Sequence, residues 1–329
     1  MKKSQCCGAV VWRFGNRRRK CGLCKKTWRI FSCRKGRKQI RQRPRFSYRV
    51  LTENRSLRKF SENVNINREK IRKRFHSSLN VILKKNFSPE KYLPNKEKLL
   101  AVTDALHFHS EGKDALIIII LLRPVKSDKA AVASIEILFG GETEENWKLA
   151  FENLSENLKK RIIALISDDS LGLVRYAKSK NWIIQICHFH LKSRFVRFLG
   201  KKKRIRFRNE RRLAYSLVTQ VASEMNNKRL GFLIREIKRL SKSNRLPKYL
   251  KIHLRGFLRN WRDYRTYLKY PKFNLPNTSN SAEAMIKIIR ETLQQKRGFK
   301  TTKSLKRWLK AIQILHPIIT CKRANHTPN

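Results

Sequence analysis

The middle of the chain alternates between continuous apolar runs and apolar residues at helical spacing. A short apolar run bounded by polar residues predicts a buried strand, and apolar residues three and four positions apart predict a helix. Helices are therefore expected at 143–158 and 171–180. The inward face of the first should comprise Trp147, Leu149, Phe151 and Leu154. Strands are expected at 99–106, 115–122, 131–139, 162–167 and 182–187.

The order of these elements is three adjacent strands followed by strands that alternate with helices. It predicts an α/β protein of the ribonuclease H-like class, with a mixed sheet and helices on both faces. Because residues 115–122 are apolar throughout, their strand should be central. Residues 191–270 are helical in pattern and strongly basic, which indicates a helical insertion. Helices at 281–295 and 302–315 follow a loop rich in Pro and Asn.

Five segments follow from this pattern and from the composition of the N-terminal region. They are a zinc-ribbon-like basic module (1–45), a helix-turn-helix domain (46–95), the catalytic core (96–190), the basic helical insertion (191–275) and C-terminal helices that complete the core (276–329).

The helix-turn-helix prediction depends on two short helices around a turn at 63–67. The first helix is expected at 56–63, and Asn67 is expected to cap the second. The apolar face of the second helix consists of Ile71, Phe75, Leu79 and Ile82. Its cationic face, which would suit a DNA major groove, includes Arg68, Lys70, Arg72 and Lys73. The alternative is an ordinary amphipathic helix with a solvated charged face.

Cysteines are concentrated near the N-terminus of the chain. The pair Cys21 and Cys24 has the spacing of a zinc knuckle, whereas Cys6 and Cys7 are adjacent; Cys33 lies further along. The chain has 7 cysteines and no visible signal peptide, which favours reduced thiols over disulfides. We expect Cys6, Cys7, Cys21 and Cys24 to hold zinc, and the alternative is a basic arm without metal.

The net charge of the chain indicates which kind of molecule it binds. The chain has 79 Lys and Arg against 23 Asp and Glu, a formal net charge of +56, which favours binding to polyanions such as nucleic acid. A membrane surface is the weaker alternative, because the longest apolar run (115–122) is far shorter than the roughly 20 residues that span a bilayer. We therefore expect a cytoplasmic protein without a membrane partner.

Three acidic residues stand out in this cationic chain. Asp104 and Asp168 each close an apolar run, and Glu283 lies near the start of a later helix. Strands one and four of the expected fold are neighbours, so these carboxylates should share a crevice and hold two Mg²⁺ ions for phosphodiester chemistry. Each also has a structural explanation: Asp104 could end a strand, Asp168 or Asp169 could cap a helix, and Asn280 with Glu283 could form a capping box. We prefer Asp168 over Asp169 because it is nearer the strand.

Cys187 and His190 follow the fifth strand with Cys-x-x-His spacing. A metal site there would need further ligands, for which His107 and His109 are the candidates. Packing or hydrogen bonding beside the active site is the alternative that we favour.

Several motifs together resemble the Mutator-like DDE transposases of prokaryotic insertion sequences. They are Thr103-Asp104-Ala105, Glu144-Glu145-Asn146-Trp147, Ile166-Ser167-Asp168, Cys187-x-x-His190, and Asn280-x-x-Glu283 followed by Arg297-Gly298. The resemblance covers about two-thirds of the chain. One departure is Asp169, which stands where the family usually has glycine.

The resemblance implies that Asp104, Asp168 and Glu283 bind catalytic Mg²⁺, for which Mn²⁺ can substitute, with Cys187, His190, Asn280 and Arg297 in support. It implies double-stranded DNA as partner, in the form of terminal inverted repeats and target DNA. It also implies a homodimer or larger assembly on DNA, and a nucleoid-associated protein of a prokaryotic cytoplasm. The alternatives are a non-catalytic DNA-binding regulator derived from a transposase, and a ribonuclease H-like nuclease.

Overall fold

The computed structural model describes residues 4, 6–14, 18–29, 57–63, 66–200, 206–295, 299 and 301–320. Near the N-terminus, three short antiparallel strands form a separate sheet: β1 (Val11–Phe14), β2 (Arg18–Cys21) and β3 (Thr27–Arg29). Two helices follow, α2 (Leu57–Asn63) and α3 (Arg68–Leu83), and then a short 3-10 turn, η1 (Pro89–Tyr92).

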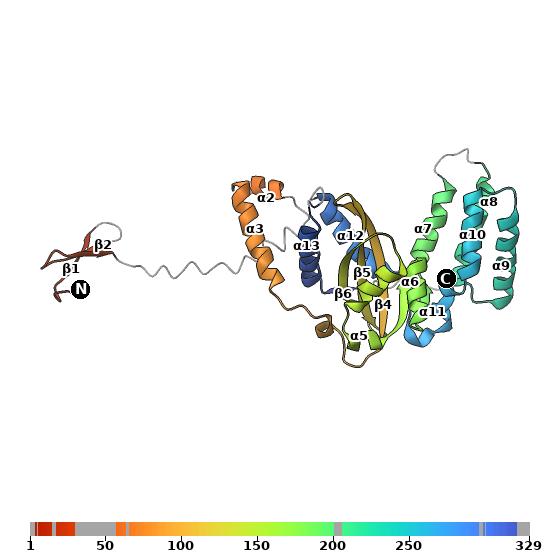
Figure 1. Ribbon diagram of the computed structural model, residues 1–329, viewed down its shortest axis with the longest axis horizontal. Coiled ribbons are helices and arrows are strands. Elements are labelled where there is room, and N and C mark those ends of the chain that lie inside the picture. Colours follow the sequence, from red (N-terminus) through yellow and green to blue (C-terminus); the bar gives the residue numbers. More distant parts are fainter. Residues whose placement is uncertain are drawn as a thin grey trace.

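A six-stranded mixed sheet forms the centre of the remaining chain (Figure 1). Its order is β8-β7-β4-β5-β6-β9. The strands are β4 (Leu99–Ser110), β5 (Lys113–Pro124), β6 (Lys129–Phe139), β7 (Ile162–Ser167), β8 (Ile183–Ile186) and β9 (Ile318–Thr320). β4, β5 and β6 form an antiparallel meander. β7 then pairs in parallel with β4, and β8 pairs in parallel with β7. This is the ribonuclease H-like arrangement, and the predicted fold class is confirmed.

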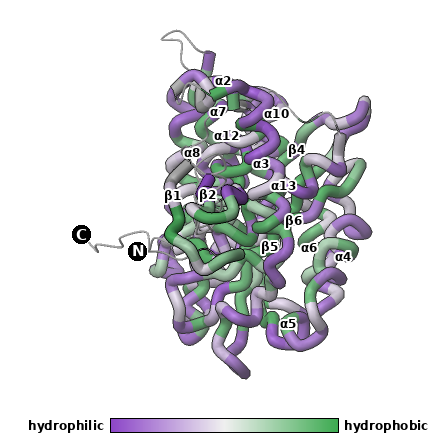
Figure 2. The backbone as a smooth tube through the Cα atoms, turned by 90° about the vertical axis from the view of Figure 1, so that its left-hand side faces the viewer, coloured by the Kyte–Doolittle hydropathy of each residue, from purple (hydrophilic) through white to green (hydrophobic). Residues whose placement is uncertain are grey.

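Alternating side chains of the central strands build two hydrophobic cores, one on each face of the sheet. In β5, Leu116 and Ile118 belong to the first core, and Ile117 and Ile119 belong to the second. Residues 115–122 of the strand are apolar and buried because both of its faces are covered; Figure 2 shows hydrophobic green segments in the region labelled β5. The first core packs against α4 (Glu144–Glu152), α5 (Glu156–Arg161) and α6 (Leu171–Ser179). The second packs against α3, α12 (Asn280–Gln295) and α13 (Thr302–Leu315).

The second N-terminal helix, α3, packs directly on this second core. Its apolar face is buried as expected, and the Phe75 ring stacks on Trp308 of α13 with centroids 4.9 Å apart. The predicted cap is also confirmed, since the Asn67 side chain accepts a hydrogen bond from the Glu69 amide at 2.8 Å. The opposite face of α3 remains exposed.

The basic insertion between β8 and α12 is helical, as predicted, within its described residues. It comprises α7 (His188–Leu199), α8 (Arg208–Ser223), α9 (Asn227–Lys242), α10 (Lys248–Asn260), η2 (Asp263–Arg265), α11 (Thr266–Lys269) and η3 (Pro271–Phe273). Figure 1 shows α7 to α10 as a bundle beyond the β8 edge of the sheet. The buried Gln185 side chain in β8 donates a hydrogen bond to the Tyr264 carbonyl and accepts one from the Tyr267 amide. These two hydrogen bonds hold the end of the insertion against this edge.

Five details differ from the sequence predictions. The strand expected at 99–106 continues to Ser110, because Leu106 and Phe108 still pack on the second core; Asp104 therefore lies within the strand. The helix expected at 143–158 divides, because Ser155 caps a new helix through the Leu158 amide. Leu149 is wrongly placed inward and is 49% exposed. The expected fifth strand ends before Cys187, which instead precedes α7 as its N-cap residue. The short strand β9 was not predicted.

Candidate active site

Two aspartates meet where β4 and β7 run side by side. These strands pair in parallel, with Val102 opposite Ile166, and two residues further on each chain reaches an aspartate, Asp104 or Asp168. Side chains alternate along a strand, and Val102 and Ile166 both belong to the second core. Asp104 and Asp168 therefore point to the face of the sheet that α12 covers.

Glu283 reaches the same place from the first turn of α12. Its carboxylate accepts a hydrogen bond from the Ser279 hydroxyl at 3.3 Å and lies 3.9 Å from the Cys187 sulfur. The Ser279 hydroxyl also contacts that sulfur at 3.3 Å. Asn280 is exposed as the first residue of the helix, and Ser279 precedes it. Within the described residues, the Glu283 carboxylate is thus held by Ser279 and Cys187 and not by the suggested capping box.

His190, in the first turn of α7, lies near these acids. Its Nε2 is 3.9 Å from the Asp104 carboxylate, and its buried Nδ1 makes no hydrogen bond to any described residue. Burial alone would lower the pKa of His190, but the Cys187 thiol, Asp104 and Asp168 outweigh it and raise the pKa to about 9. The imidazole is therefore a cation at neutral pH.

Burial is the main cause of the unusual pKa values of the three acids. It raises the pKa of Asp104 to about 7, where Asp168 and Glu283 add to the increase and His190 opposes it. It raises the pKa of Asp168 to about 6, with a contribution from Glu142, and it also raises the pKa of Glu283. Buried carboxylates supply the hard oxygen ligands that a divalent cation prefers, whereas the described group at this site whose ligand atoms lie within 4.8 Å of one another is Cys187, His190 and Glu283.

Asp168 and Asp169 have different partners, although they are adjacent. Asp169 forms a two-pronged ion pair with Arg194 of α7 and accepts a hydrogen bond from the Tyr264 hydroxyl at 3.4 Å. Burial opposes ionisation of Asp169, but the Arg194 guanidinium overcomes it and lowers the pKa of Asp169. Asp168 accepts only a backbone hydrogen bond, from Ser170 at 3.1 Å, among the described residues. The geometry therefore leaves Asp168 as the carboxylate that is available to a metal.

The structure adds Glu142, which the sequence gave no reason to select. It lies in the turn before α4, close enough to raise the pKa of Asp168, and it contacts His107 Nε2 at 2.8 Å. Gly172 permits this approach, because a Cβ there would lie 2.4 Å from the Glu142 carbonyl oxygen. His109 contacts Asp114 at 3.2 Å. In the described chain the group that joins Cys187 and His190 within metal-ligating range is thus Glu283, not either of these histidines.

The N-terminal cysteines form a second cluster. The sulfurs of Cys6, Cys7, Cys21 and Cys24 all lie within 4.8 Å of one another. A Cβ on Gly22 would lie 2.8 Å from the Trp12 indole nitrogen, so glycine lets the turn pack against β1. The Ser4 hydroxyl lowers the pKa of Cys21 to about 6, whereas Cys24 raises the pKa of Cys7 to about 12. Four thiols at these distances fit a tetrahedral zinc ion despite the adjacent Cys6 and Cys7; Cys33 lies outside the described residues.

The four residues of α3 that were predicted to contact DNA are all exposed, namely Arg68, Lys70, Arg72 and Lys73. Arg72 also pairs with Glu69 at 2.8 Å on the same helix. Their role in binding DNA stays a prediction. Arg297 lies outside the described residues. None of the described helices has the length and apolar character that would let it cross a membrane.

The sheet order and the acids at the ends of β7 and within β4 define a ribonuclease H-like protein with a carboxylate cluster on one face of its sheet. Residues 122–316 match the family model described as "Transposase, Mutator family", and the chain belongs to this family. The match includes Asp168 and Glu283 and begins after Asp104. No curated protein matches the chain. Membership makes the protein a transposase by family, for which DNA is the substrate class.

Proposed function

We propose that the protein is a DDE transposase that cuts DNA at transposon ends and joins the ends to target DNA. The observation that supports this most strongly is the convergence of Asp104, Asp168 and Glu283. Asp104 lies in β4, Asp168 follows β7 and Glu283 lies in α12, yet Asp168 and Glu283 are both close enough to raise the pKa of Asp104. Burial and neighbouring acids raise the pKa of Asp104 and Asp168, and carboxylates with strongly perturbed pKa values gather at functional sites.

Asp104, Asp168 and Glu283 are the residues that would hold Mg²⁺, or Mn²⁺ in its place. When bound, the metal supplies activation of the attacking water or 3′-hydroxyl and stabilisation of charge on the leaving oxygen. Ser279 and Cys187 orient the Glu283 carboxylate, and the Asp169–Arg194 pair fixes the segment that carries Asp168. His190, cationic at neutral pH, lies 3.9 Å from the Asp104 carboxylate and can offset negative charge at the site.

DNA binding would be shared by several parts of the chain. In this proposal the cysteine cluster holds zinc and, with the exposed cations of α3, recognises the terminal repeats. The basic insertion contacts phosphates through charge. Joining two transposon ends requires two active sites, so we propose at least a homodimer on DNA, encoded by a prokaryotic insertion sequence and acting at the nucleoid.

The test uses the full-length protein with Mg²⁺ and duplexes that carry the two ends of the encoding element. Wild type is compared with Asp168→Ala and with Asp114→Ala, a control at an exposed acid on β5. We expect strand cleavage and strand transfer in wild type and in the control, and neither in Asp168→Ala, which should still bind DNA. Tight binding without cleavage in all three proteins would indicate a non-catalytic regulator, and cleavage without joining would indicate a nuclease.

A further inference from the structure

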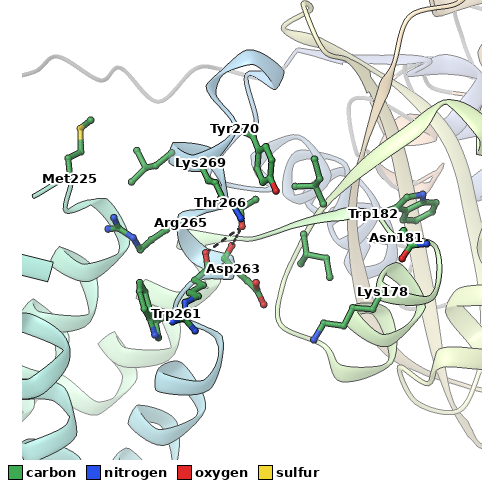
Figure 3. Close-up of a pocket in the computed structure, with 14 residues that line it drawn as sticks. Lys178, Asn181, Trp182, Met225, Trp261, Asp263, Arg265, Thr266, Lys269 and Tyr270 are labelled. Atoms are coloured by element: carbon green, nitrogen blue, oxygen red, sulfur yellow. Dashed lines mark hydrogen bonds between the residues drawn. The ribbon is translucent and has the colours of Figure 1, made fainter. Parts of the chain in front are cut away.

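A cavity of about 940 Å³ separates the start of β8 from the end of the helical insertion (Figure 3). Trp182 and Lys178 line it from the core, while Trp261 and Arg265 line it from the insertion. The acid cluster lies beyond the opposite end of β8, and the segment from Ile183 to Cys187 spans roughly 13 Å. The cavity is thus a separate site, and neither the family match nor the acid cluster assigns it a role.

Cations surround this cavity. Lys178, Arg262, Arg265 and Lys269 line it, against a single acid, Asp263. Lys178, Arg262 and Lys269 are exposed, whereas Arg265 is partly buried and donates to the Val221 carbonyl at 2.7 Å. The excess of positive charge favours a ligand that carries phosphate groups.

Aromatic rings lie among these cations. The Arg262 guanidinium sits over the Trp261 ring at 4.9 Å, and the Lys269 ammonium over Tyr270 at 5.4 Å. Trp182 is held from behind by Phe151 and Tyr176, at centroid distances of 5.1 and 5.7 Å. Aromatic rings interleaved with cations are the combination that binds single-stranded nucleic acid, through stacking on bases and attraction to phosphates.

Asp263 lies at the centre of the cavity, between the two walls (Figure 3). Its side chain is half-buried, and within the described chain its carboxylate makes no hydrogen bond or ion pair. Burial raises the pKa of Asp263, although Lys178 opposes the increase. An acid in this position is an unused acceptor, and the exposed edge of an unpaired base offers N–H donors.

We propose that this cavity binds unpaired nucleotides next to a transposon end. Trp261 stacks on a base, Asp263 accepts a hydrogen bond from a base N–H, and the surrounding Lys and Arg side chains contact phosphates. A base inside a duplex shows only its edge, so stacking on Trp261 selects for an unpaired base. The proposal rests on the proposed function only in taking DNA as the substrate.

The experiment compares two fluorescent duplexes, one blunt and one with a short single-stranded extension, by anisotropy titration of the full-length protein. No Mg²⁺ or Mn²⁺ is added, so cleavage plays no part, and no chelator is present that would remove zinc from the cysteine cluster. The matched variants are Trp261→Ala and Tyr249→Ala, the latter at an aromatic residue of α10 that is 73% exposed outside the cavity. We expect wild type and Tyr249→Ala to prefer the extended duplex, and Trp261→Ala to bind it about tenfold more weakly with unchanged blunt binding. Trp261→Phe should restore most of the preference.

Asp263→Ala gives a second test, because it removes both the negative charge and the hydrogen-bond acceptor. If the cavity attracts DNA by charge alone, removal of the acid should strengthen binding. If Asp263 accepts from a base, binding of the extended duplex should weaken several-fold. Stronger binding by Asp263→Ala, or equal affinity of wild type for both duplexes, would overturn the proposal. A preference for the extended duplex that Trp261→Ala abolishes would support it even if the protein proved unable to cleave DNA.

Discussion

The carboxylate cluster and the cysteine cluster are built in opposite ways. Asp104, Asp168 and Glu283 come from distant parts of the chain and are largely buried between a sheet and α12. The four cysteines come from one short segment, and three of them are exposed. A local turn can bring thiols together without a core, whereas the acids require the folded sheet.

The two clusters also differ in the metal ion that their side chains favour. Buried oxygens favour a hard cation such as Mg²⁺, whose charge offsets the cost of ionising the acids. Exposed thiols favour zinc, which can itself hold a small module together. Under the proposed function, the acid cluster would serve the reaction and depend on the fold, while the cysteine cluster would hold its own segment together through zinc.

The largest effects are expected from variants that remove a metal ligand from one cluster, because each should affect only the metal of that cluster. Asp104→Asn should reduce Mg²⁺-dependent cleavage to background and leave the zinc content at one equivalent, because it removes a hard ligand only. Cys24→Ser should lose the zinc. The segment that carries the four cysteines should then lose its structure, since zinc contributes about 10–16 kcal/mol of folding free energy to such modules. The variant should still cleave the DNA that it binds. Cleavage assays and metal analysis check both, with Cys187→Ser as the cysteine control for zinc content. Loss of both properties in either variant would contradict the separation.

The next effect concerns pH and the metal-free protein. Folded Asp104 keeps its proton up to about pH 7, whereas an unfolded aspartate releases it near 3.8, so stability should fall as pH rises between these values. Protonated Asp168 contributes stability that is lost in the same way up to about pH 6. The raised pKa of His190 extends the fall in stability toward pH 9. Asp104→Asn lacks this titrating group. Its free energy of unfolding should therefore rise, relative to that of wild type, by on the order of 2–4 kcal/mol between pH 4 and pH 8. Denaturant unfolding in EDTA measures this, and parallel pH profiles would refute it.

The smallest effect sharpens the distinction between the two adjacent acids. Arg194→Met should destabilise the protein by about 1–3 kcal/mol, because it leaves partly buried Asp169 without its cation. Arg197→Met, at an exposed position of the same helix, is the matched control and should change little. Combined with Asp169→Asn, Arg194→Met should cost less than the sum of the single changes, as expected for interacting partners. Additive losses in urea unfolding would show that the two residues act independently.

The alternating apolar pattern determined much of the fold. It predicted the order of five core strands, the central position of β5, the helical insertion and the final helix at 302–315. It failed where tertiary packing outweighed the local pattern. Polar Asp104 and His107 seemed to limit β4, but antiparallel pairing with β5 extends that strand to Ser110. Ser155 in turn divides a helix that the apolar spacing alone would have continued.

The candidate site divides in the same way. The sequence by itself determined which acids close apolar runs and that four cysteines lie within one segment, because strand periodicity and ligand spacing are local properties. Only the tertiary structure decided that Asp169 is committed to Arg194, that Glu142 lies near Asp168, and that Glu283 meets Cys187 and His190. It alone placed Asp263 at the centre of a cationic cavity. These are contacts between residues far apart in the chain, and they depend on register, packing and burial, which no local pattern specifies.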